Sequence, residues 1–180
     1  YLQENFSLYK LKLLEKRVSS ADGTTKFLFE LHDGEKIESV FMPTETRRTL
    51  CVSTQVGCPL KCHFCMTGQM GFRRDLETGE ILDQVISSNF LLSQDLPLSP
   101  NQHPITNVVF MGMGEPLLNW PKTSKAIRIL QSDSGPAIGS RKITVSTSGV
   151  ADKILELALE ETKFKLAISL SGKRKLFVIQ

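Results

Sequence analysis

The sequence predicts an α/β protein built around a parallel β-sheet. From Leu50 onward, strand-like and helix-like segments alternate along the chain, which is typical of right-handed βαβ units. The run from Asn107 to Met111 is short and mostly apolar, as in a buried parallel strand. Loops rich in glycine, cysteine or serine follow several of these strands, and parallel sheets bind ligands at the carboxyl ends of their strands. We therefore expect one functional site at that edge of the sheet.

Length and composition fit a single globular domain. The chain has 180 residues, of which 41% are hydrophobic and 23% are charged. Its net charge of +3 (22 basic minus 19 acidic residues) is a weak indication of an anionic partner. No apolar run is long enough to cross a membrane, and the first residues lack the apolar segment of a secretion signal, so we expect a cytoplasmic protein. The chain begins at Tyr1, which indicates that residues are missing at this end.

We expect residues 1–49 to form an extension made of a short helix and a β-hairpin. A helical spacing of three or four residues separates the apolar side chains of Leu8, Leu11, Leu14 and Val18. Asp33-Gly34 is a strong hairpin signal between two strand-like runs, Thr25–His32 and Lys36–Met42.

Residues 50–171 are expected to form the core and residues 172–180 a separate tail. Strands are predicted at Leu50–Val56, Asn107–Met111, Lys142–Ser146 and Lys165–Leu170. Helices are predicted after the N-cap candidate Thr78, at Pro121, and over Ala151–Glu161.

Three cysteines, Cys58, Cys62 and Cys65, lie within eight residues. Thiols become thiolates readily beside a cation or a metal, so this spacing indicates a metal site. Three thiolates can hold a 4Fe–4S cluster and leave one iron open for chemistry. Alternatively, Cys51 could complete a four-thiolate zinc site, although zinc sites usually pair two separated knuckles. The spacing favours the cluster over zinc, and a disulfide is less favoured still.

Other candidate residues follow or line the predicted strands. Glu38 shares a strand face with Val40 and Met42, where a carboxylate could serve as a general base, although an exposed edge-strand Glu is the commoner case. Glu115, in Gly-Met-Gly-Glu-Pro, could accept from an ammonium group, or the segment could be a plain strand-to-helix turn. The loop Ser146–Gly149 and the tripeptide Ser169–Ser171 carry hydroxyls suited to a ribose or carboxylate. Arg73 and Arg74 could contact nucleic-acid phosphate or be simply exposed.

Five segments together resemble one family closely: Cys51-Val-Ser-Thr-Gln-Val-Gly-Cys58, the cysteine trio, Gly71-Phe-Arg-Arg74, Val108–Asn119 and Ile143–Gly149. The family is the radical S-adenosylmethionine (radical-SAM) RNA adenine-C2 methyltransferases, the dual-specificity RlmN-type enzymes that act on 23S rRNA and tRNA. The resemblance runs from about Ser19 to Leu170 and is highly specific. A closely related branch methylates C8 of the same ribosomal adenine.

The resemblance implies a partial radical-SAM (β/α) barrel with a 4Fe–4S cluster and S-adenosylmethionine (SAM) as cofactors. It assigns Cys58, Cys62 and Cys65 to the cluster, Glu38 to proton acceptance, and Cys51 to a transient disulfide that releases product. SAM contacts are implied for Gly114, Glu115, Ser146, Ser169, Leu170 and Ser171. The implied partners are 23S rRNA, tRNA and an electron donor such as flavodoxin, and the implied full-length state is a monomer.

The sequence departs from the family at its end. Family members have His at the position of Ser171, and residues 172–180 are unlike the family's next segment. Family chains continue for well over a hundred residues, which include the cysteine that carries the methyl group. We therefore expect a truncated or frameshifted chain that does not complete the reaction. The alternatives are C8 methylation and a zinc-binding RNA-interaction module that uses Cys51 with the trio.

Overall fold

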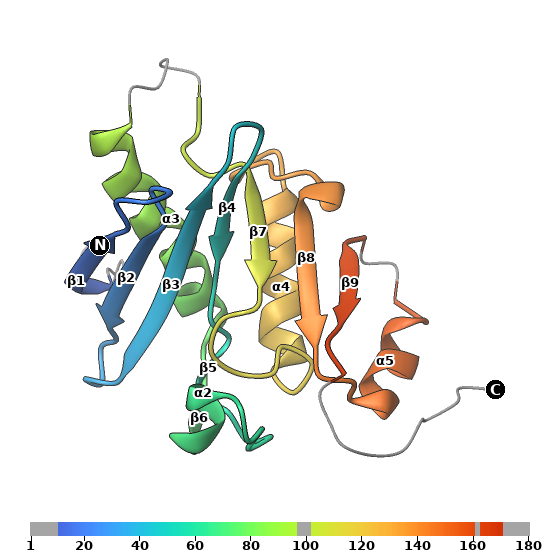
Figure 1. Ribbon diagram of the computed structural model, residues 1–180. Coiled ribbons are helices and arrows are strands. Elements are labelled where there is room, and N and C mark those ends of the chain that lie inside the picture. The colour runs from blue at the N-terminus through green and yellow to red at the C-terminus, as the bar shows by residue number, and fades with distance from the viewer. Residues whose placement is uncertain (1–10, 97–101, 161–162, 171–180) are drawn as a thin grey trace, which may run out of the picture.

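A computed structural model of the protein describes residues 11–96, 102–160 and 163–170. Within them, one sheet has seven strands in the order β1-β2-β3-β4-β7-β8-β9 (Figure 1). The first four pair antiparallel, and β4, β7, β8 and β9 pair parallel. Their bounds are β1 Lys12–Val18, β2 Thr25–Glu30, β3 Lys36–Pro43, β4 Arg48–Cys51, β7 Asn107–Phe110, β8 Ile143–Thr147 and β9 Lys165–Ile168.

Two helices, α3 (Thr78–Asp95) and α4 (Trp120–Gln131), cover one face of this sheet (Figure 1). Every second strand residue points toward them, so the core is built from one side of each strand. The fully buried side chains include Phe27, Phe29, Ile37, Phe41, Leu50, Val108, Phe110, Ile143 and Val145. The alternate residues, among them Glu38, Cys51 and Ser146, are only half-buried. We call their side the uncovered face.

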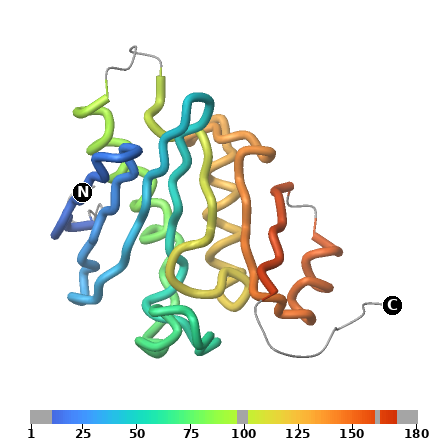
Figure 2. The backbone as a smooth tube through the Cα atoms, in the orientation of Figure 1, coloured from blue at the N-terminus to red at the C-terminus, as the bar shows by residue number. Residues whose placement is uncertain are grey.

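The carboxyl ends of β4, β7 and β8 lie at one end of the molecule, the lower end in Figures 1 and 2. A two-stranded ribbon, β5 (Gln55–Gly57) paired with β6 (Phe72–Asp75), lies there with the short helix α2 (Met66–Gln69). The helix α5 (Ala151–Leu157) lies beside β9 at the sheet edge, and a 3-10 turn, η1 (Ser140–Lys142), leads into β8. The cysteine loop therefore projects from the end at which parallel sheets bind ligands.

The predicted α/β class with a parallel sheet is confirmed, and so is the hairpin at Asp33-Gly34. The strands predicted over Asn107–Met111 and Lys142–Ser146 are present as β7 and β8, with bounds that differ by one residue. The predicted N-terminal helix is wrong in its described part. Residues Lys12–Val18 form strand β1 because they pair with β2, and a bulge between Leu13 and Glu15 shifts the register. Leu8 lies outside the described residues. Pairing with a neighbouring strand overrides a helical apolar spacing in a short segment.

Two further predictions need correction. The single strand expected over Leu50–Val56 is divided, because β4 ends at Cys51 and β5 belongs to the ribbon. The N-cap of α3 is Glu77 rather than Thr78: Glu77 and Glu80 form a capping box. A carboxylate satisfies the first backbone N–H groups of a helix as well as a hydroxyl does, so the start of this helix is displaced by one residue.

Candidate functional site

The ribbon holds both ends of the cysteine loop together. The backbone N–H of Cys58 donates to the carbonyl of Gly71 at 3.1 Å. Gly57 has φ +74°, and a Cβ there would lie 1.7 Å from the Gly71 carbonyl oxygen. Only glycine combines this backbone conformation with so close an approach. The two strands therefore meet tightly just before Cys58, which fixes where the cysteine loop begins.

The three cysteines of this loop are free thiols and lie close enough to influence one another. Burial raises the pKa of the Cys58 thiol, and the negative charges of Cys62, Cys65 and Glu115 raise it further. Three neighbouring thiolates are stable together only if a cation balances them, so this donor set fits an iron–sulfur cluster. In the described part of the chain, no three His, Cys, Asp or Glu side chains are already arranged as a metal site.

Glu115 connects two of the predicted site loops. Its side chain is buried, and one carboxylate oxygen accepts hydrogen bonds from the backbone N–H and the hydroxyl of Ser148, at 2.9 and 3.0 Å. The other oxygen accepts from the backbone N–H of Leu117 at 3.1 Å. A carboxylate offers about four acceptor positions, so these three donors leave one for a ligand. Glu115 therefore joins the loop after β7 to the loop after β8.

The glycines before Glu115 are required by packing. A Cβ on Gly112 would lie 2.7 Å from the Ser53 hydroxyl oxygen, and a Cβ on Gly114 would lie 2.6 Å from the Cβ of Gln55. Gly114 also has φ +100°. The loop after β7 therefore lies directly against the segment that joins β4 to β5. Close packing against Ser53 and Gln55 is therefore enough to require glycine in this turn, whether or not a ligand also binds there.

A buried side-chain amide, that of Gln84, holds the segment that joins β4 to β5. Gln84 of α3 is fully buried, and its oxygen accepts from the Ser39 hydroxyl and the Ser53 backbone N–H, at 2.9 and 2.8 Å. Its amide nitrogen donates to the Ser53 carbonyl at 3.0 Å. The Ser53 hydroxyl in turn donates to the Glu38 carbonyl at 2.7 Å. Such a satisfied network fixes the chain between β3 and the cysteine loop.

The serines predicted to contact SAM come from adjacent strands. The hydroxyls of Ser146 in β8 and Ser169 after β9 lie 3.2 Å apart. The Ser169 backbone N–H donates to the Thr147 carbonyl at 2.8 Å, and Leu170 is exposed. A Cβ on Gly149 would lie 3.0 Å from the Leu170 side chain. The structure therefore brings Ser146, Ser169 and Leu170 together, whereas Ser171 lies outside the described residues.

Glu38 and Cys51 lie on the uncovered face in neighbouring strands. Val40 pairs with Cys51, and Glu38 is two residues from Val40 on the same face. Lys26 of β2 places its ammonium 2.8 Å from the Glu38 carboxylate, and both side chains are about 40% exposed. Burial raises the pKa of the Cys51 thiol to about 11. Cys51 is the last residue of β4, whereas the trio lies in the loop between β5 and β6.

Sequence reasoning missed Lys26 and Gln55, and it named Ser148 only as part of the hydroxyl-rich loop Ser146–Gly149. Alternation within the hairpin could have placed Lys26 near Glu38, because cross-strand neighbours share a face. The arginines that could contact RNA phosphate differ in the structure. Arg73 is exposed, whereas Arg74 donates to Glu80 at 2.8 and 2.9 Å and to Asp33 at 2.7 Å. Arg74 therefore joins the hairpin turn to α3.

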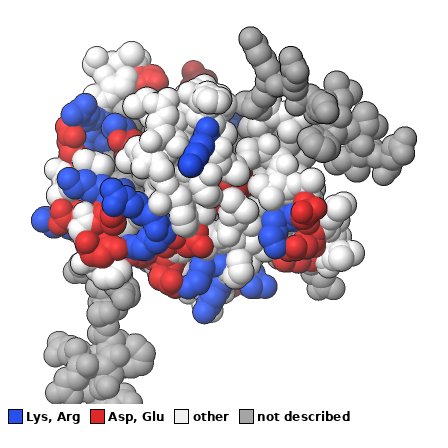
Figure 3. Space-filling view, turned by 90° about the horizontal axis from the view of Figure 1, so that it is seen from below, with Lys and Arg blue, Asp and Glu red and all other residues white. Residues whose placement is uncertain are grey.

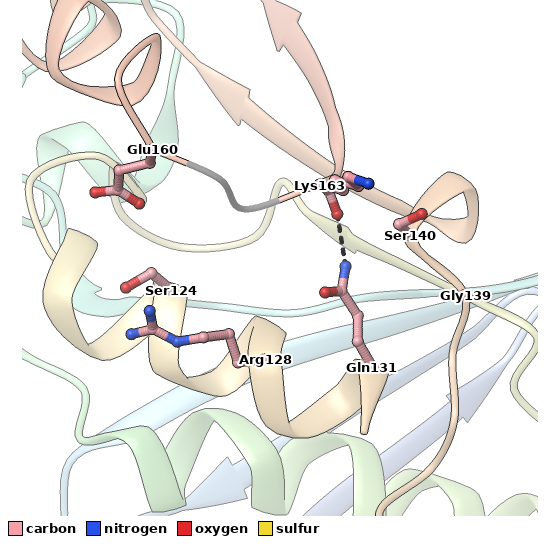
Figure 4. A pocket seen from close by; sticks show the side chains of 7 residues that line it. All are labelled: Ser124, Arg128, Gln131, Gly139, Ser140, Glu160 and Lys163. Carbon is pink, nitrogen blue, oxygen red and sulfur yellow. Dashed lines mark hydrogen bonds between the residues drawn. The ribbon is translucent and has the colours of Figure 1, made fainter. Parts of the chain in front are cut away.

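A separate cavity lies away from these loops, toward the amino ends of β8 and β9 (Figure 4). Gln131 of α4 crosses it and donates to the Lys163 carbonyl at 2.6 Å. Its remaining lining residues are Ser124, Arg128, Gly139, Ser140 and Glu160. None of the predicted site residues lines it, and ligands of parallel sheets bind at the opposite ends of the strands.

The end of the molecule that carries the cysteine loop is shown from outside in Figure 3. Charged side chains of both signs lie mostly along its margins, and a basic side chain and a small acidic patch lie among the uncharged residues of its middle. Exposed apolar residues of the cysteine loop and ribbon include Phe64, Met66, Met70 and Phe72. Among the described helices, none combines the length and the apolar character needed to span a membrane.

Comparison of the sequence with known protein families agrees with this geometry. The model of the radical SAM superfamily matches residues 52–172, which contain the cysteine trio, the Glu115 loop and both serine loops. The chain belongs to the radical SAM superfamily. Within it, the relatives found among known proteins are RNA methyltransferases of the RlmN type.

The "Probable dual-specificity RNA methyltransferase RlmN" of Thermotoga maritima is 53% identical to the chain over 169 residues. A protein of the same name from Desulfitobacterium hafniense is 47% identical over 174 residues. Each match covers 94% of this chain and 47% of the relative, so the chain spans about half the length of these relatives. A crystal structure of a radical SAM methyltransferase from Sphaerobacter thermophilus superposes with a TM-score of 0.84 at 42% identity, covering 94% of this chain and 48% of that one.

Proposed function

We propose that this chain is the cluster- and SAM-binding part of a radical-SAM enzyme that methylates C2 of an adenine in 23S rRNA and in tRNA. The observation that carries the proposal is the convergence of the cysteine loop, the Glu115 loop and the two serine loops at the carboxyl ends of the parallel strands. The name and the identity of the Thermotoga maritima relative support the choice of RNA as substrate. C2 of adenine is electron-poor, so it does not attack a methyl cation equivalent, and radical chemistry suits it.

In this proposal Cys58, Cys62 and Cys65 hold a 4Fe–4S cluster. When bound, the cluster and SAM together supply a one-electron reductive cleavage that generates a carbon-centred radical. The free acceptor position of Glu115 and the backbone at Gly114 bind the ammonium group of SAM. The hydroxyls of Ser146 and Ser169 bind its remaining polar groups. Leu170 and Ser171 are proposed as further SAM contacts.

The uncovered face then supplies the groups that act on the base. Glu38 accepts the proton from C2, and the Lys26 ammonium holds its carboxylate in place. Cys51, on the same face, provides the thiolate that attacks the sulfur of the methyl-carrying cysteine. The bond between that sulfur and the carbon attached to the base then breaks, the carbon keeps the electron pair, and the two sulfurs form a disulfide as product is released. The high pKa of Cys51 means that a base must deprotonate it first.

The partners follow from this chemistry. The RNA must present an unpaired or extruded adenine, since ring carbons in a stacked helix are inaccessible. A soluble electron donor such as flavodoxin reduces the cluster. We also propose that the full-length enzyme is a monomer and that it works in the cytoplasm. The present chain has four cysteines, three of which are proposed ligands, so the relay of two further cysteines is incomplete in it.

The test is anaerobic reconstitution of the purified chain with iron and sulfide. We expect about four iron and four sulfide ions per chain. Addition of SAM and a reductant should then give 5′-deoxyadenosine and methionine, measured by mass spectrometry. A Cys62→Ser variant, with one ligand removed, is the matched control and should give neither product. Binding of one zinc ion through four thiolates, without charge-transfer absorption, would refute the proposal in favour of a zinc module.

A further inference from the structure

Gln55 is a buried amide that uses both of its ends at the junction of two site loops. Its side chain is 1% exposed. The amide oxygen accepts the backbone N–H of Glu115 at 2.8 Å, and the amide nitrogen donates to a carboxylate oxygen of Asp75 at 2.7 Å. Asp75 pairs with Gln55 across the ribbon, directly after the cysteine loop. One side chain therefore connects the strand that leaves the cysteine loop to the backbone of Glu115.

The backbone of Gln55 contacts the same loop. Its N–H donates to the Met113 carbonyl at 3.2 Å, and a Cβ on Gly114 would lie 2.6 Å from the Gln55 Cβ. The three residues Met113, Gly114 and Glu115 thus lie against Gln55 through backbone and side chain together. No polar atom of the Gln55 amide remains for solvent, because burial leaves only these partners.

The connection continues beyond Glu115. The Glu115 carboxylate holds the backbone N–H and hydroxyl of Ser148, so a continuous hydrogen-bonded chain runs from Asp75 through Gln55 and Glu115 to Ser148. It joins the ribbon, the loop after β7 and the loop after β8. The ribbon encloses the loop that carries the proposed cluster ligands, the loop after β7 carries the proposed SAM contacts Gly114 and Glu115, and the loop after β8 directly follows the proposed SAM contact Ser146.

We infer that Gln55 is a positioning residue that sets the Glu115 loop against the cysteine loop, so that SAM meets both at once. This inference rests on the proposed function. An amide is required because its two ends must be an acceptor and a donor. A Glu at this position has no N–H to donate to Asp75, and above the carboxyl pKa values it would place two mutually repelling carboxylates 2.7 Å apart.

The test uses three variants of this chain. Gln55→Glu breaks the connection to Asp75, whereas Gln55→Glu combined with Asp75→Asn restores it with donor and acceptor exchanged. Asp75→Asn alone is the control, because its amide oxygen can still accept from Gln55. The first readout needs no cofactor: native-state hydrogen exchange of the Ser148 and Leu117 amides, with the Val109 and Val145 amides of the central sheet as reference.

We expect Gln55→Glu to speed exchange at Ser148 and Leu117 about tenfold or more without changing Val109 and Val145. On the reconstituted chain it should weaken SAM binding by about tenfold at unchanged iron content. The double variant should recover both values. Faster exchange at every amide would overturn the inference, since it would show only general support of the fold. Unchanged SAM affinity in Gln55→Glu would overturn it as well. If the unaltered chain bound no cluster and no SAM, the proposed function would fail, and the exchange data would still decide whether Gln55 connects the loops.

Discussion

Arg74 and Glu80 form a two-pronged ion pair in which both terminal guanidinium nitrogens donate to the carboxylate, at 2.8 and 2.9 Å. The Glu80 side chain is 3% exposed. Burial alone would raise the pKa of Glu80, but the Arg74 hydrogen bonds and the Glu77 backbone N–H together lower it. The same guanidinium lowers the pKa of Asp33. A single side chain thus holds the hairpin turn, the ribbon and the start of α3.

This pair predicts a pH-dependent loss of stability. Both carboxyl pKa values are lower in the folded than in the unfolded chain, so their stabilisation is present above the unfolded values and is lost as pH falls through the folded ones. Arg74→Gln should cost about 3 kcal/mol at pH 7, because it removes the two-pronged cationic partner of a buried carboxylate and leaves it only the Glu77 backbone N–H and His32. Urea unfolding at pH 7 and pH 3 checks this: the difference between variant and parent should shrink at pH 3. A pH-independent difference would exclude the ion pair as its cause.

Glu115→Gln should weaken both the loop connection and SAM binding. In Gln only the amide oxygen is an acceptor, so the side chain can no longer accept from both Ser148 and Leu117. A charge-assisted hydrogen bond to a buried group is worth roughly 1.5–3 kcal/mol, which corresponds to about ten- to a hundredfold in SAM affinity. Ser148→Ala is the matched control, because it removes the hydroxyl and keeps the backbone N–H. Equilibrium binding of SAM to the reconstituted chain is the measurement. SAM affinity equal to that of the parent would remove Glu115 from the site.

Two glycines of the ribbon should respond differently to alanine. Gly57 and Gly71 both have positive φ, +74° and +77°, so either substitution strains the backbone by roughly 1–2 kcal/mol. Only at Gly57 does the new Cβ meet another atom, the Gly71 carbonyl oxygen at 1.7 Å, whereas nothing lies within 4 Å of a Cβ on Gly71. Gly57→Ala should therefore lower iron incorporation strongly and Gly71→Ala only slightly. Equal iron contents in the two variants would contradict the claim that close packing of Gly57 against the Gly71 carbonyl positions the cysteine loop.

Cys51 should alkylate slowly in the cluster-free chain. Its pKa of about 11 lies about two units above that of an ordinary thiol, so at pH 7.5 its thiolate fraction is about a hundredfold smaller. Iodoacetamide labelling followed by peptide mass spectrometry gives the rate, with a small cysteine peptide as reference. The labelling rate should keep rising up to about pH 11. A plateau near pH 9 would show an unperturbed thiol.

The chain by itself should not methylate RNA. The proposed relay needs a methyl-carrying cysteine in addition to Cys51 and the three ligands, and the chain has four cysteines in total. Reconstituted protein, reductant, labelled SAM and unmodified RNA are incubated together, and the digested RNA is analysed for 2-methyladenosine. Repeated turnover to this product would refute the claim that the chain lacks a cysteine that methyl transfer requires.

The parallel half of the fold could be predicted because its signals are local. Val108, Val109 and Phe110 form a continuous apolar run, and Pro121 lies in the first turn of α4, where its missing N–H has no cost. The N-terminal strand could not be predicted in this way. Its apolar spacing imitates a helix, and only the partner β2 and the hydrogen bond from the Leu11 backbone N–H to Asp83, 72 residues away, decide its conformation.

In the candidate site, too, the features that depend on local sequence could be predicted and those that depend on long-range contacts could not. The cysteine spacing and Glu115 are visible in short motifs, so their placement at one end of the sheet could be foreseen. Gln55 lies within a quoted motif, but its role depends on Asp75, twenty residues later, and on a backbone N–H, which carries no sequence signal. Lys26 acquires its position only when β2 and β3 pair. Long-range contacts between polar groups are what sequence patterns omit.

The change from antiparallel to parallel pairing at β4 has a kinetic consequence. Strands β1 to β4 pair with their sequence neighbours, so their loops are short and close in microseconds. The contact between β4 and β7 instead joins Arg48 to Thr106, 58 residues away, and must wait for a large loop to close. We expect the meander to fold first, while β7 is still unpaired. The sheet that holds the cysteine loop would then grow from a template already formed by strands β1 to β4.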